Sequence, residues 1–217
     1  MFEHPKDTKF KLFIPFGPRM ADITLPGEIM DKLIKITDDI LDDDNRISHG
    51  HSLAGQIREE PQISWELMAE NGLEEYFDSL LKLYVESSLA TMGIRWSDLG
   101  IEKTSPPWIV SQYENEYNPL HWHTNSTMSC VIYLKVPKFI PRDIPGKRDT
   151  DGKIVFVNHT VDQSKDLNLG VHEINPVPGK MYIFPANLNH AVWPFQGEGE
   201  RRSISFNAKH YHTLKPV

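Results

Sequence analysis

Three histidines of this chain have the spacing of a metal site. His121 and His123 are two residues apart, so both imidazoles project from the same face if this stretch is extended. His190 follows the turn Pro178-Gly179 and a short strand, in a loop rich in proline and asparagine. Imidazole nitrogens bind iron, zinc and copper. The pattern predicts a metal held by one histidine pair and one distant histidine.

A second group of polar side chains begins eleven residues after His190. If the segment 201–207 is a strand, one of its faces is polar throughout and carries Arg201, Ser203, Ser205 and Asn207. Burying such a face requires a polar partner for each group. A bound dicarboxylate is such a partner, because an arginine can bind a carboxylate with two hydrogen bonds while a serine hydroxyl donates beside it.

The elements that must position these residues change in character along the chain. Apolar residues at helical spacing predict helices over 27–43, 64–70 and 73–92. Later, short apolar or alternating runs between turn signals predict strands over 108–113, 127–134, 153–157, 180–184 and 203–207. Because the strands follow the helices, a doubly wound parallel fold is excluded. We expect a mainly β sandwich or barrel with helices packed on one sheet.

Length and composition limit what the protein can be. The 217 residues predict a single domain, 1–217, with an N-terminal strand and supporting helices in 1–100 and the β core in 101–217. The formal charge of −7 argues against nucleic acid and anionic lipid as partners. Cys130, the single cysteine, excludes internal disulfides. With neither a long apolar run nor a signal peptide, we expect a soluble cytoplasmic protein.

In this order and spacing, the residues resemble the 2-oxoglutarate/Fe(II)-dependent oxygenase superfamily, and more narrowly a small branch of it. The matching pieces are His121-Trp122-His123, Cys130-Val131-Ile132-Tyr133-Leu134, Pro178-Gly179 with Phe184-Pro185 and His190, and the closing segment Arg201–Asn207. The resemblance spans most of the chain and is strongest from Trp108 to Asn207. It implies a double-stranded β-helix, a jelly-roll whose open mouth holds the metal.

The resemblance also implies a reaction and a set of site residues. His121, His123 and His190 would bind Fe(II), and Arg201 and Ser203 would hold the far carboxylate of 2-oxoglutarate. Tyr113 stands where the superfamily often places a hydrogen-bonding tyrosine near the cosubstrate. With O₂, the enzyme would couple oxidative decarboxylation of 2-oxoglutarate to oxidation, as in a hydroxylase, of an unidentified substrate.

One position departs from the superfamily pattern, which usually supplies two histidines and one carboxylate to the iron. Here His123 stands at the carboxylate position. We expect either a three-histidine site or a two-histidine site in which His123 serves the substrate. Asn125 is an alternative oxygen ligand, and Trp122 should point away from the metal and pack on the other face of the strand.

Two other functions stay open. One is a cupin-type three-histidine dioxygenase that does not use 2-oxoglutarate, and the other is a non-catalytic metal- or ligand-binding jelly-roll. We expect a small-molecule or peptide substrate, and whether the chain forms a homo-oligomer is undetermined. The loops 137–152 and 158–170 would control specificity, whereas His49 and His51 lie in a polar loop with no expected role.

Overall fold

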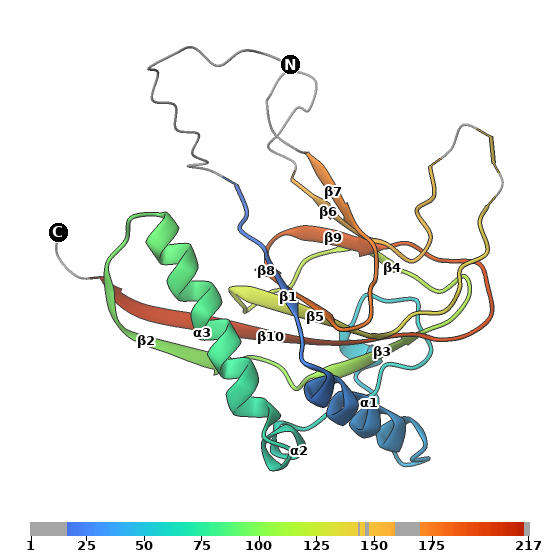
Figure 1. Cartoon of the computed structure of the whole chain (residues 1–217), viewed down its shortest axis with the longest axis horizontal. Helices are drawn as coiled ribbons and strands as arrows, with labels where there is room; N and C mark the ends of the chain where they lie inside the picture. Colours follow the sequence, from blue (N-terminus) through green and yellow to red (C-terminus); the bar gives the residue numbers. More distant parts are fainter. Residues whose placement is uncertain (1–16, 143, 146–147, 159–169, 215–217) are drawn as a thin grey trace.

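The helices form almost where the apolar spacing predicts them. A computed structural model describes residues 17–142, 144–145, 148–158 and 170–214 (Figure 1). A short strand, β1 (Ala21–Thr24), precedes α1 (Gly27–Leu41), and a single 3-10 turn, η1 (Gly50–Ser52), leads toward α2 (Trp65–Glu70) and α3 (Leu73–Thr91). Ser64 Oγ accepts a hydrogen bond from the Leu67 N–H at 3.1 Å, which caps α2.

Two antiparallel sheets form the rest of the described chain. The larger sheet has the strand order β1-β8-β5-β10-β2, and β3 also pairs with β10. Its further strands are β2 (Trp96–Lys103), β3 (Trp108–Gln112), β5 (Met128–Lys135), β8 (Lys180–Pro185) and β10 (Arg201–Leu214). The smaller sheet has the order β4-β9-β6-β7, from β4 (Asn118–His121), β6 (Ile154–Val157), β7 (Val171–Ile174) and β9 (Asn189–Val192).

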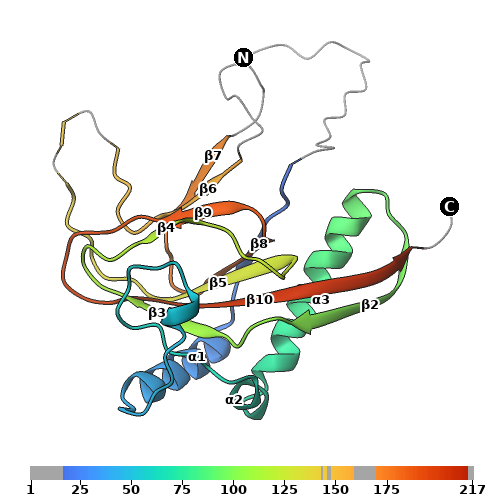
Figure 2. The same ribbon diagram turned by 180° about the vertical axis from the view of Figure 1, so that it is seen from behind.

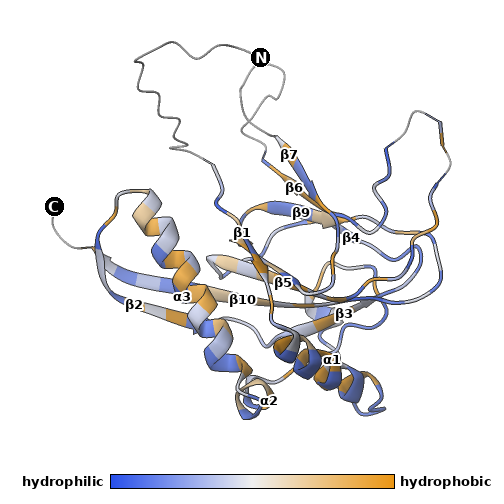
Figure 3. Ribbon diagram, viewed as in Figure 1, coloured by the Kyte–Doolittle hydropathy of each residue, from blue (hydrophilic) through white to orange (hydrophobic). Residues whose placement is uncertain are grey.

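The two sheets face each other, and helices α1 and α3 cover the outer face of the larger one (Figures 1 and 2). Alternation along β5 separates two cores, since Cys130 and Ile132 pack against the helices while Val131 and Tyr133 pack between the sheets. The orange and blue bands of α1 and α3 in Figure 3 show the amphipathic pattern that this packing requires. The expected mainly β fold with helices on one sheet is confirmed.

Some strand boundaries differ from the prediction. The short strands β4, β7 and β9 and the strand β2 were not among the predicted strands, and β10 continues well beyond residue 207. His190 therefore lies in β9, and its placement in a loop was wrong, because four residues rich in polar side chains carry little strand signal. The boundary expected after residue 100, between the N-terminal helices and the β core, lies inside β2, which pairs with the C-terminal half of β10.

No described helix is long and apolar enough to cross a membrane.

Part of the expected first strand, His159 and most of the 158–170 loop lie outside the described residues.

Candidate metal and cosubstrate site

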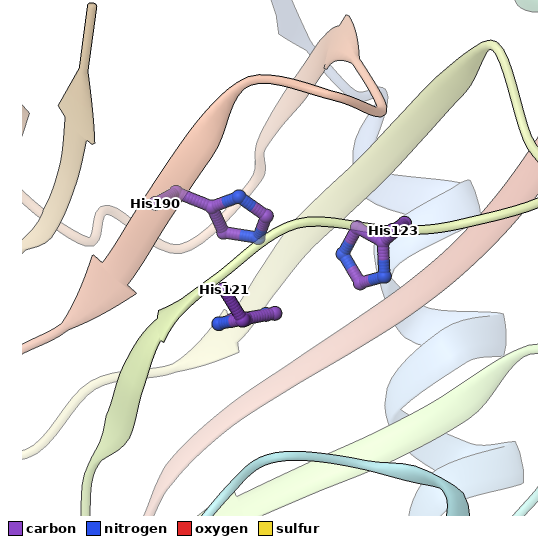
Figure 4. Close-up of side chains that lie close together, drawn as sticks. All are labelled: His121, His123 and His190. Atoms are coloured by element: carbon purple, nitrogen blue, oxygen red, sulfur yellow. The ribbon is translucent and has the colours of Figure 1, made fainter. Parts of the chain in front are cut away.

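The structure brings the three predicted histidines together. Strands β4 and β9 pair in a register that sets His121 opposite His190. His123 lies two residues past β4, where its backbone N–H donates to the Ala186 carbonyl at 2.9 Å. Ligand nitrogens of all three lie within 4.8 Å of one another. Figure 4 shows the three rings around a common space, which matches the donor set of a metal site.

Hydrogen bonds orient two of these rings for metal binding. The Nδ1–H of His121 donates to the Pro119 carbonyl at 2.7 Å, and that of His190 donates to the Leu188 carbonyl at 2.8 Å. Because a carbonyl only accepts, the proton stays on Nδ1 and each Nε2 keeps its lone pair. Such hydrogen bonds to the far nitrogen are typical of metal-binding histidines.

The third ring, His123, contacts the side-chain amide of Asn207. Its Nδ1 lies 3.3 Å from Asn207 Nδ2, while the buried Asn207 Oδ1 has no hydrogen-bond partner. Turning this amide over would let Oδ1 accept from the His123 Nδ1–H, because the amide nitrogen and oxygen are interchangeable in shape. His123 would then have the same tautomer as the other two histidines.

Burial keeps the histidines neutral. It lowers the pKa of His123 to about 4 and that of His190 to about 3, and it also lowers the pKa of His121. Neighbouring imidazoles add to the effect on His123 and His190. Near pH 7 all three rings therefore offer neutral nitrogen, the form that binds metal.

Arg201 reaches the same cavity from the larger sheet. Its side chain is fully buried, with Nε donating to the Gly152 carbonyl and Nη1 to Gln112 Oε1, each at 3.1 Å. No carboxylate of the described chain pairs with it, and a buried charge without a counterion is costly. The cavity is lined by Arg201, Ser203, Ser205, Ser129, Tyr133 and the three histidines, among others. It can therefore bind an anion beside a metal.

The structure does not bring Tyr113 into this group. Tyr113 is 44% exposed, does not line the cavity, and donates its backbone N–H to Glu116 Oε2. Tyr133 on β5 lies opposite Ser203, and its ring lies 5.0 Å from Arg201 Cζ. The Tyr133 hydroxyl is buried near this guanidinium, and burial raises its pKa to about 12, so it stays protonated. Its inward position in the alternation of β5 was the sequence signal that could have identified it.

Residues near the H-x-H motif add no carboxylate or amide ligand. Asn125 Oδ1 accepts from Lys209 Nζ at 2.6 Å, and Glu114 and Glu116 accept backbone N–H groups. Among the described residues none of these acidic groups joins the histidine cluster. Trp122 lines the cavity and is 58% exposed, so the expectation that it packs on the far face of the strand is wrong.

Segment 48–62 is the part of the site that sequence reasoning missed. A polar loop carrying His49 and His51 was expected here, with no role for the two histidines, yet Ser52, Leu53, Ala54 and Glu60 line the cavity. The His49 ring stacks on Trp108 with ring centroids 5.3 Å apart. Nothing in the local pattern indicates this position, because it depends on pairing with β3, about fifty residues later in the chain.

Comparisons with known proteins agree with this geometry. Residues 107–207 match the model of a family described as "Putative 2OG-Fe(II) oxygenase". No curated protein matches the sequence of the chain.

Three solved structures show the similarity of fold. A Pseudomonas putida prolyl-4-hydroxylase is 14% identical, with 91% of this chain and 93% of that chain covered and a TM-score of 0.52. A Trichoplax adhaerens prolyl hydroxylase, in complex with a hypoxia inducible factor peptide fragment, is 13% identical, with coverage of 89% and 83% and a TM-score of 0.54. AviO1 from Streptomyces viridochromogenes Tue57 is 13% identical, with coverage of 92% and 93% and a TM-score of 0.55. These similarities confirm the expected double-stranded β-helix.

Proposed function

We propose that this chain is a 2-oxoglutarate/Fe(II)-dependent oxygenase whose iron is held by His121, His123 and His190, and the family match over residues 107–207 supports this proposal. When bound, Fe(II) together with 2-oxoglutarate and O₂ supplies the chemistry that decarboxylates the cosubstrate and oxidises an unidentified substrate. The residues of the chain bind and orient the reactants and keep water from them.

The donor set fits iron. Three neutral imidazoles suit Fe(II), and hydrogen bonds to the carbonyls of Pro119 and Leu188 fix two of them. Replacing the usual carboxylate by His123 removes one negative charge from around the metal. The site then attracts the doubly negative 2-oxoglutarate more strongly.

Arg201 is the main support for 2-oxoglutarate as the cosubstrate. It is buried, lines the same cavity as the three histidines, and has no carboxylate partner in the described chain. In our proposal its guanidinium binds the C5 carboxylate of 2-oxoglutarate. The hydroxyls of Ser203 and Tyr133 donate beside it, so Tyr133 takes the part that the sequence suggested for Tyr113.

In our proposal the substrate binds in this cavity, whose lining includes Trp108 and Trp122. A small molecule or a peptide is the proposed substrate class, and the structural relative from Trichoplax is itself in complex with a peptide. A net charge of −7 opposes nucleic acid as a partner, and action in the cytoplasm is part of the proposal.

An anaerobic titration tests this function. Purified protein receives Fe(II) and then 2-oxoglutarate, while the visible spectrum is followed for the metal-to-ligand charge-transfer band of a chelated 2-oxo acid. We expect the band to saturate at one equivalent of cosubstrate. Iron binding without the band would favour the cupin-type dioxygenase, and failure to bind iron would favour the non-catalytic jelly-roll.

A further inference from the structure

The segment 48–62 closes one side of the cavity. The Gln56 N–H donates to the Tyr117 carbonyl at 2.8 Å, and the Ser111 N–H donates to the Glu59 carbonyl at 3.0 Å. These bonds hold residues 56–59 against β3 and the turn that follows it. Glu60, the next residue, consequently turns its side chain toward the cavity.

Glu60 is buried and its carboxylate lacks a partner. The residue is 3% exposed, and no donor of the described chain forms a hydrogen bond or ion pair with its side chain. Arginines nearby have other partners, since Arg46 pairs with Glu59 at 3.0 Å and Arg58 with Glu116 at 3.1 Å. A buried carboxylate is normally satisfied by donors, so Glu60 has unused capacity to bind one.

A second acceptor oxygen lies close to this carboxylate. A Cβ atom at Gly55 would meet Glu60 Oε1 at 2.9 Å and Asn118 Oδ1 at 2.5 Å, so both oxygens pack closely against this glycine and lie near each other. Ca²⁺ takes six or more oxygen ligands. One carboxylate and one amide oxygen instead suit an organic group with several N–H donors.

The rest of the cavity agrees with a cationic group. Trp108 and Trp122 line it, and the faces of tryptophan rings attract organic cations. Among the described residues that line the cavity, Glu60 is the only acidic one, whereas Arg201 provides positive charge there. An anion such as a second 2-oxoglutarate would be repelled by Glu60.

We propose that Glu60, with Asn118, selects a substrate that carries a cationic nitrogen, an ammonium or a guanidinium group. This inference rests on the proposed function, because it names the class of substrate for the same site. The Glu60 carboxylate binds the cation, the Asn118 side-chain oxygen accepts a further N–H, and the absence of a side chain at Gly55 lets these two acceptors lie close together. Burial and the nearby Glu116 carboxylate raise the pKa of Glu60 to about 7, and an incoming cation would favour its ionised form.

Binding of small probes to the anaerobic complex with Fe(II) and 2-oxoglutarate tests the proposal. The probes are n-butylammonium and n-butylguanidinium, with n-pentanol and butyrate as uncharged and anionic counterparts of similar size, measured by saturation-transfer NMR. We expect at least one of the two cations to bind more tightly than both n-pentanol and butyrate. Preference between the two cations would distinguish an amine from a guanidine substrate. Cations that bind no better than n-pentanol would overturn the proposal.

Variants identify the residue responsible. Glu60→Gln should weaken binding of the preferred cation by about tenfold or more, as expected for loss of a charged partner. Glu59→Gln is the matched control, because Glu59 pairs with Arg46 and is absent from the lining, and it should leave binding unchanged. Equal losses in the two variants would contradict the assignment. Circular dichroism and thermal unfolding establish that each variant is folded.

A further variant avoids dependence on Glu60→Gln alone. Gly55→Ala retains both acceptors, but its methyl group would clash with both of them and displace them, so it should also weaken cation binding. The charge-transfer band of the wild-type protein separates the two proposals. If the band forms and cations do not bind, only the substrate inference fails. If the band never forms, the proposed function fails.

Discussion

Two adjacent arginines on β10 have opposite surroundings. Arg202 points toward the helices and donates to both carboxylate oxygens of Glu200, each at 2.6 Å, and to Asp38 at 2.6 Å. Arg201 points between the sheets, where it donates to the neutral acceptors of Gly152 and Gln112. The alternation of a strand therefore separates a structural arginine from one that can bind a ligand.

Arg201→Ala should abolish binding of 2-oxoglutarate without loss of iron. It removes the cation that we assign to the C5 carboxylate but leaves the three histidines intact, so affinity should fall by well over about tenfold. The charge-transfer titration measures the cosubstrate and elemental analysis the iron. Ser203→Ala, which removes one hydroxyl, should have a smaller effect. Loss of iron with retained cosubstrate binding would show that this part of β10 is misassigned.

His123→Asp should retain or strengthen binding of Fe(II). If His123 occupies the carboxylate position, an aspartate there restores the usual donor set and its negative charge attracts the metal. Competition with a coloured chelator measures the affinity. His172→Asp, at an exposed histidine on β7, is the control and should not change it. A collapse of iron affinity in His123→Asp would instead indicate a role that requires imidazole.

Glu60→Gln should stabilise the protein in a pH-dependent manner. The pKa of Glu60 is raised from 4.5 to about 7, chiefly by burial and then by the charge of Glu116. Between these values the folded state binds more protons than the unfolded state, so stability falls as pH rises through this window. The variant lacks this cost, which is largest above pH 7 and disappears well below pH 4.5.

Urea unfolding at pH 4.5 and pH 8 measures the difference. We expect Glu60→Gln to be more stable than the wild type at pH 8 only, with Glu59→Gln close to the wild type at both. A gain of the same size at both pH values would mean that the buried charge is not its cause.

At the scale of elements, a cluster of charges fixes α1 to the larger sheet. Asp38, near the C-terminal end of α1, accepts from Arg202 of β10 and from Lys135 of β5, each at 2.6 Å. Hydrogen bonds to Lys135 and Arg202 lower the pKa of Asp38. Thr37 Oγ1 accepts from Arg202 at 3.0 Å. These bonds join a helix and two strands behind the site.

Arg202→Met should reduce the free energy of unfolding by about 3 kcal/mol, because it leaves the carboxylates of Glu200 and Asp38 without their buried partner. Lys35→Met is the control, since Lys35 pairs with Asp39 on the surface, with the two side chains 75% and 65% exposed. It should cost less than about 0.5 kcal/mol. Urea unfolding measures both, and equal effects would contradict a special role for the cluster.

At the scale of the whole molecule, the site joins the two sheets. His121 and His190 belong to β4 and β9 of the smaller sheet, whereas Arg201 and Ser203 belong to β10 of the larger one. A ligand held at both ends therefore connects elements that otherwise meet through the apolar core between the sheets. We expect such a ligand to stabilise the folded molecule as a whole.

Fe(II) together with 2-oxoglutarate should raise the melting temperature under anaerobic conditions. At one hundred times the dissociation constant the stabilisation is about 2.7 kcal/mol, which corresponds to roughly 5 to 10 °C for a domain of this size. Scanning calorimetry measures the shift. Arg201→Ala should keep only the part due to iron. If 2-oxoglutarate does not raise the melting temperature of the wild-type protein beyond the value with Fe(II) alone, the proposal that the cosubstrate contacts both sheets is contradicted.

The sequence by itself determined the features that depend on local period. Helical spacing predicted α1, α2 and α3, and alternation placed Arg201 and Ser203 on one face of β10 with Arg202 on the other. The H-x-H spacing put His121 and His123 on one side of the chain. These features follow from the periods of helix and strand, which neighbouring residues establish without distant contacts.

Tertiary structure alone decided which distant residues share the cavity. Tyr133 lies beside Arg201, whereas Tyr113 is in an exposed turn, because β5 and not the end of β3 provides the inward face there. Glu60 reaches the cavity through pairing of its segment with β3. Contacts of this kind form across long stretches of chain, and the packing of the sheets, which no short pattern encodes, determines them.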